Sequence, residues 1–140
     1  MGNIVTNIGS GLMKFTFTDM DGDVFAYFRM NPADIKLINR LNTLDQKLEE
    51  LQKRFEGRTD DMELVMEFNN AVEELFCYVL GYDVKECLFG FASALSVMDN
   101  GQCFWEKIME VLEREVGKEV EKRGKKMQNN IRKYTEKYKQ

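Results

Sequence analysis

Three aspartates at alternate positions come closest, of all residues in this chain, to a known ligand set. Asp19, Asp21 and Asp23 resemble the opening of a calcium-binding loop. That loop also needs a glycine at its sixth position and a glutamate at its twelfth, where this chain has Val24 and Met30. We therefore interpret the aspartates as an acidic turn between two strands.

Histidine and cysteine usage argues against nucleophilic and metal chemistry. The chain has no histidine, which removes the commonest general base, the usual activator of serine and cysteine nucleophiles, and a frequent zinc ligand. Its three cysteines, Cys77, Cys87 and Cys103, form no Cys-x-x-Cys pair. We interpret them as reduced thiols that pack as small hydrophobic side chains. We predict that the chain is not an enzyme and binds no cofactor or metal.

Residues 1–12 are polar and contain several glycines, and we predict that they form a flexible lead-in. Met1-Gly2-x-x-x-Thr6 fits the myristoylation pattern, but this pattern is short and the modification requires a eukaryotic enzyme. The basic and apolar regions of a signal peptide are missing, and no apolar run reaches the roughly 18 to 20 residues that cross a bilayer. We therefore expect a cytoplasmic protein with no membrane partner.

Charge is distributed unevenly along the chain. There are 20 Lys and Arg against 24 Asp and Glu, for a net charge of −4. Residues 122–140, the basic tail, contain eight Lys or Arg and a single acid, so they carry +7 and leave −11 on residues 1–121, the acidic body. Such asymmetry is typical of an interaction segment.

The order of predicted elements defines the fold class. Aromatic and β-branched runs on both sides of the aspartate turn predict a β-hairpin over 13–29. Apolar spacing and capping residues, including Asn31 as the first cap, predict helices over about 32–55, 60–80, 83–90 and 102–138. We expect a mainly α (α+β) protein. An N-terminal hairpin precedes about four amphipathic helices in one domain over 13–121, and residues 122–140 form a basic helical extension.

Two apolar stripes are candidates for binding a partner protein. The leucines of the first predicted helix repeat at heptad spacing, which suits either the chain's own core or a partner. In the basic tail, single apolar residues stay in helical register on a cationic surface. The predicted partner-binding residues are Leu41, Leu44, Leu48, Leu51, Phe55, Met127, Ile131, Tyr134 and Tyr138.

The basic tail itself has three interpretations. It is a solvated helix end, a helix that lies in a partner's groove, or a nucleic-acid-binding segment whose tyrosines stack on bases. The acidic body would repel a phosphate backbone, so we do not expect nucleic acid as a partner.

The order of elements resembles that of the tail assembly chaperones of long-tailed bacteriophages. The hairpin residues 15–25 and the segments 83–90 and 100–106 carry the resemblance. The two later segments are similar to the family's pattern of an aspartate-led turn that ends in Phe-Gly, followed by a glycine turn into an aromatic-Glu helix. The resemblance extends from about residue 13 to the C-terminus, and the strongly basic last helix departs from it.

The resemblance implies a chaperone that is absent from the finished virion. Such a protein would coat the hydrophobic, helical tape measure protein, keep it soluble in the bacterial cytoplasm, and deliver it to the tail tube protein during polymerisation. It would also form homo-oligomers, as rings or spirals. Two other function classes stay open: a phage or mobile-element regulator or inhibitor that docks on a host protein, and a nucleic-acid-binding accessory protein that acts through residues 122–140.

Overall fold

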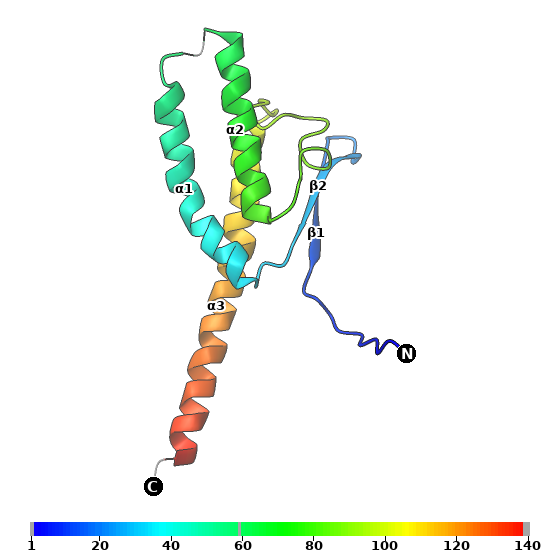
Figure 1. The fold of residues 1–140 in the computed structure, drawn as a ribbon, viewed down its shortest axis with the longest axis vertical. Coiled ribbons are helices and arrows are strands. Elements are labelled where there is room, and N and C mark those ends of the chain that lie inside the picture. The colour runs from blue at the N-terminus through cyan, green and yellow to red at the C-terminus, as the bar shows by residue number, and fades with distance from the viewer. Residues whose placement is uncertain (1, 59, 139–140) are drawn as a thin grey trace.

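The computed structural model describes the backbone of residues 2–58 and 60–138, and their side chains except those of 126–131 and 133–138. The chain is an α+β protein in which a two-stranded antiparallel hairpin precedes three helices (Figure 1). In order, the elements are β1 (Met13–Thr18), β2 (Val24–Met30), α1 (Ile35–Phe55), α2 (Met62–Leu80) and α3 (Phe104–Tyr138). The predicted class is confirmed, whereas the count of about four helices was too high for the described part of the chain.

The hairpin forms where the sequence predicts it. β1 pairs antiparallel with β2, and Phe15 lies opposite Phe28. In the turn, the carboxylate of Asp19 accepts hydrogen bonds from the backbone N–H groups of Asp21 and Asp23 at 2.9 and 3.0 Å. The aspartate segment is therefore an acidic hairpin turn in which the first carboxylate is engaged by its own backbone.

The predicted starts of the first two helices lie too early in the sequence. Asn31 belongs to a turn in which its side chain accepts a hydrogen bond from the backbone of Ala33 at 3.0 Å. Asp34 caps α1 instead, because its carboxylate accepts the backbone N–H of Lys36 at 3.0 Å. Asp61 caps α2 in the same way, one residue after the predicted Asp60; the other predicted cap, Thr59, lies outside the described residues.

The heptad leucines of α1 pack into the chain's own core. Leu37, Leu41, Leu44 and Leu48 are buried in one cluster with the apolar faces of α2 and α3. A fully buried leucine contributes about 1.5–3 kcal/mol relative to an exposed one, so this stripe is a major source of stability. In Figure 1, α1, α2 and the first part of α3 stand together, and the hairpin lies to one side of them.

The predicted helix over 83–90 is absent, and the segment is a succession of turns. One helical hydrogen bond forms, from the N–H of Leu88 to the carbonyl of Val84 at 2.8 Å. The carbonyl of Cys87, which a continuing helix would offer to the N–H of residue 91, instead accepts the N–H of Tyr27, on the outer edge of β2, at 3.0 Å. Contact with the hairpin therefore replaces helix propagation here.

The long last helix is present as α3, and those of its described side chains that are buried in the core lie in its first half. Ile108, Leu112 and Val116 are buried, whereas Val120 is exposed. Beyond this point α3 continues past the rest of the molecule (Figure 1). At this exit the Arg123 guanidinium donates a hydrogen bond to the carbonyl of Ala33. Among the described residues, no helix combines the length and the apolar character that crossing a bilayer requires.

Candidate protein-binding surface

A concave apolar surface lies between the hairpin turn and the loop that leads into α3. This surface, called here the apolar hollow, has a volume of about 580 Å³. Its walls are the end of β1 with the turn at 18–21, the loop over 91–100 and the first turn of α3. The hairpin and the stretch over 91–107, which are distant in the sequence, therefore form one surface.

The floor of the hollow is part of the aromatic core. Phe104, the first residue of α3, is 1% exposed and packs edge-to-face on Phe17 with ring centroids 5.3 Å apart. Phe25 lies 5.6 Å from the same ring. Because these rings are held by core packing, the floor is rigid before any partner arrives.

The rim of the hollow carries large apolar side chains that project into solvent. The exposed fractions are 91% for Met20, 83% for Phe91 and 69% for Val97. The ring of Phe91 lies at the edge of the floor, where its centroid is 6.1 Å from that of Phe25. A rigid floor surrounded by exposed apolar side chains is typical of a protein-binding surface.

Two buried polar side chains of α2 hold the loop wall in place. Glu73 accepts the backbone N–H of Ala94 at 3.1 Å and the side-chain amide of Asn69 at 2.8 Å. Asn69 in turn accepts the backbone N–H of Leu95 at 3.1 Å. Buried polar groups satisfied in this way impose one conformation on the loop, so Phe91 is presented from a fixed backbone.

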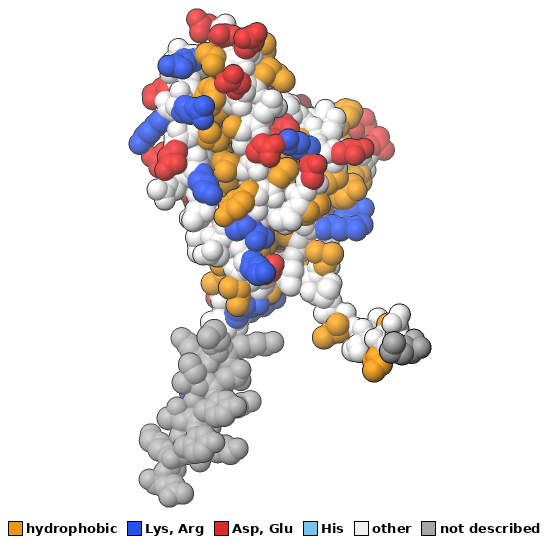
Figure 2. Space-filling view, viewed as in Figure 1, with side chains coloured by type: hydrophobic (Ala, Val, Ile, Leu, Met, Phe, Trp, Pro, Cys, Tyr) orange, Lys and Arg blue, Asp and Glu red, His pale blue; other side chains and the backbone are white. Residues whose placement is uncertain are grey.

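The charges around the hollow are mainly negative. Asp19, Asp21 and Asp99 line it together with one cation, Lys107, which is already paired with Glu110 at 3.4 Å. Figure 2 shows acidic side chains gathered beside hydrophobic ones at the right-hand edge of the body, where Figure 1 places the hairpin turn. An apolar surface with a negative rim favours a partner that is apolar along one face and cationic beside it.

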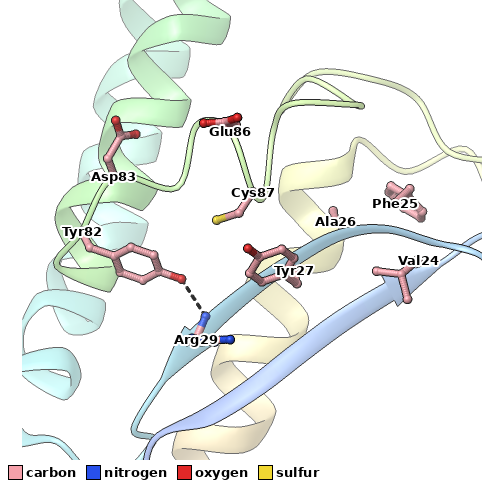
Figure 3. Close-up of a pocket in the computed structure, with 9 residues that line it drawn as sticks. All are labelled: Val24, Phe25, Ala26, Tyr27, Arg29, Tyr82, Asp83, Glu86 and Cys87. Carbon is pink, nitrogen blue, oxygen red and sulfur yellow. Dashed lines mark hydrogen bonds between the residues drawn. The ribbon is translucent and has the colours of Figure 1, made fainter.

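A second groove, of about 720 Å³, lies on the other side of β2 and carries polar groups (Figure 3). The hydroxyl of Tyr82 accepts the backbone N–H of Arg29 at 2.7 Å, and burial raises the pKa of this hydroxyl. In Figure 3 the carboxylates of Asp83 and Glu86 point away from the thiol of Cys87. Neither carboxylate is therefore placed to deprotonate the Cys87 thiol.

The thiols are free and partly buried in the structure. Burial raises the pKa of the Cys77 thiol, and burial together with the nearby Glu106 carboxylate raises that of Cys103. Both groups are therefore protonated at neutral pH, which is the unreactive form of cysteine. Among the side chains that the structure describes, no three Cys, Asp or Glu residues lie close enough together to hold a metal ion.

The structure does not place the predicted partner-binding residues on one surface. Leu41, Leu44, Leu48 and Phe55 are buried in the chain's own core, and Leu51 is partly buried against it. These side chains therefore stabilise the chain's own core, and a role for them in binding a partner stays a prediction. The other predicted residues are Met127, Ile131, Tyr134 and Tyr138, whose side chains lie outside the described residues.

Sequence reasoning missed the residues that form the hollow's rim. Met20 sits in a turn, and Phe91 and Val97 lie in a loop that has neither helical nor strand periodicity. One signal could have indicated the rim. Met20 is a large apolar residue in a turn flanked by aspartates, where an apolar side chain has no neighbours to pack on.

Comparison of the chain with protein-family models, with curated proteins and with solved structures found no match. The functional conclusion therefore depends on the apolar hollow and its charges, together with the pattern of the sequence.

Proposed function

We propose that this chain is a non-catalytic chaperone that binds an apolar helical segment of another protein, and that the apolar hollow receives the client's apolar side chains. The observation that carries the proposal is the exposure of Met20, Phe91 and Val97 around a rigid aromatic floor. Covering these side chains removes apolar surface from water on both partners, which is the main driving force of association.

The resemblance to tail assembly chaperones suggests the client. In that proposal the client is the tape measure protein, a long helical chain that needs protection until the tail tube protein polymerises around it. The complex would form in the bacterial cytoplasm and would be absent from the finished virion. The acidic body suits this role, because a net negative surface keeps a complex with an apolar client in solution.

A regulator or inhibitor that docks on a host protein would use the same hollow. This alternative differs from the chaperone proposal only in the protein that is bound. Nucleic acid is disfavoured as a partner, because acidic side chains line the apolar hollow and would repel a phosphate backbone.

Co-expression tests the proposal directly. The chain is produced together with the tape measure protein encoded by the same genome, and the fraction of that protein left in the supernatant is measured. We expect the wild-type chain to keep the client soluble and Phe91→Ser to lower the soluble fraction several-fold, because the rim loses its largest exposed anchor.

The matched control is Ile35→Ser, at a residue on α1 that is 70% exposed and lies outside the hollow. It should protect the client as well as wild type does. A client that precipitates with the wild-type chain, or one that Phe91→Ser protects fully, would refute the proposal.

A further inference from the structure

We propose that the apolar hollow of one copy binds the C-terminal half of α3 from a second copy, so that copies associate head to tail. This inference rests on the proposed function only in that both use the same hollow. It adds a defined competitor for the client, namely the chain's own basic tail.

The chemistry that the hollow selects is present in the basic tail. The hollow needs a segment with an apolar stripe flanked by cations, because its floor is aromatic and Asp19, Asp21 and Asp99 line it. In the sequence of the tail, apolar residues recur at 127, 131, 134 and 138, which is the spacing of one helical face. Eight Lys and Arg residues accompany this stripe.

The tail is also preorganised for binding. α3 is continuous from Phe104 to Tyr138, so the backbone of the stripe is already helical. A helix that is formed before it binds loses less conformational entropy on association. Eleven residues at a helical rise of 1.5 Å separate the ends of the stripe, which gives it a length of about 17 Å.

The tail cannot reach the hollow of its own chain. Phe104 and Lys107 line the hollow at the start of α3, and this helix of 35 residues leads away from it to Tyr138. At 1.5 Å per residue the far end is about 50 Å from the hollow. In Figure 1 α3 ends at the bottom of the molecule, whereas the hairpin turn lies in its upper half. A straight α3 therefore delivers its tail to another copy.

This geometry has a consequence for assembly. The two contacting surfaces differ, so an open assembly always keeps one free hollow and one free tail, and copies continue to add unless a ring closes. The opposite charges of the tail, +7, and the body, −11, favour the contact at low ionic strength and weaken it as salt is added. A client with an apolar helix would displace the tail and open the assembly.

Sedimentation velocity of two complementary variants tests the inference. The first is Phe91→Glu, which places a negative charge in the rim at a side chain that is 83% exposed and keeps the tail. The second ends at Lys125, which removes the apolar stripe of the tail and keeps both the hollow and the contact of Arg123 with Ala33. Wild type should associate as its concentration rises, and each variant alone should sediment as a monomer.

Mixing the two variants should restore one contact. The intact tail of Phe91→Glu enters the intact hollow of the truncated chain, so a dimer forms and growth stops there. Raising sodium chloride from 50 to 500 mM should weaken this dimer by on the order of tenfold. The inference is overturned if wild type stays monomeric, if either variant alone associates as wild type does, or if the mixture forms no dimer.

The truncated chain also separates this inference from the proposed function. It retains the hollow, so it should still keep the client soluble during co-expression. If it does so while the mixing experiment fails, the hollow binds clients but not tails.

Discussion

Glu73 and Asn69 look like ordinary polar residues of a helix, yet their side chains hold in place the loop that forms one wall of the hollow. Both are nearly buried, with exposed fractions of 9% and 6%, and they satisfy the N–H groups of Ala94 and Leu95. A buried N–H without an acceptor costs about 1–3 kcal/mol, so the two side chains and the loop depend on each other.

We expect Glu73→Ala to lower the free energy of unfolding by about 1–3 kcal/mol, because it leaves the N–H of Ala94 and the amide of Asn69 without an acceptor. Urea denaturation followed by circular dichroism measures this change. Glu74→Ala is the matched control: this neighbouring acid is exposed and pairs with Lys85 at the surface, so its loss should cost no more than about 1 kcal/mol. Equal stability of the two variants would contradict the role given to Glu73.

At the scale of single elements, α1 shows how one pattern can serve two purposes. Heptad leucines are compatible with a partner helix or with the chain's own core, and in the structure α2 and α3 cover them. In the segment 83–90 the capping residues predict a helix, but the carbonyl of Cys87 accepts a hydrogen bond from the hairpin instead. Neighbouring elements thus decided both outcomes.

Leu44→Ala should destabilise the monomer by about 2–5 kcal/mol, because it removes a fully buried side chain and leaves a cavity. Thermal melting at several protein concentrations should show the same loss at each of them. Ile35→Ala on the same helix, at a residue that is 70% exposed, should leave the melting curve nearly unchanged. If Leu44→Ala instead melted like wild type and merely lost self-association, α1 would be an interface rather than core.

At the scale of the whole molecule, α3 links a core helix to a projecting one. Among its described side chains the buried ones end near Val116, and its second half carries most of the Lys and Arg residues of the helix. An acidic body and a basic projection on one rigid helix give the molecule two unlike ends, which is the arrangement that head-to-tail assembly requires.

A chain that ends at Lys125 should keep its free energy of unfolding within about 0.5 kcal/mol of wild type, since it loses no described core residue. Chemical denaturation at a concentration where wild type is monomeric measures this. A chain that ends at Glu115 is the comparison, because it loses the buried Val116 and the contact of Arg123, and it should be clearly less stable. A large loss in the longer chain would place the tail in the core.

The local sequence by itself determined the hairpin, the three long helices and the end of α2 at Gly81. These features depend on short-range physics: an aspartate-glycine turn, apolar spacing of 3.6 residues, and a glycine that adopts a φ of +83° without steric cost. Each of these can be evaluated within a few neighbouring residues, so a single sequence suffices to predict them.

The tertiary structure alone decided what the apolar residues are for. Whether Leu44 faces a partner or the core depends on α2 and α3. The carbonyl of Cys87 accepts a hydrogen bond from Tyr27 rather than from a helical neighbour, because β2 lies beside it. Met20 and Phe91 are distant in the sequence, and they line one hollow because the hairpin packs beside the loop before α3. No local sequence pattern predicts this surface, because the free energy that forms it comes from contacts between segments rather than within them.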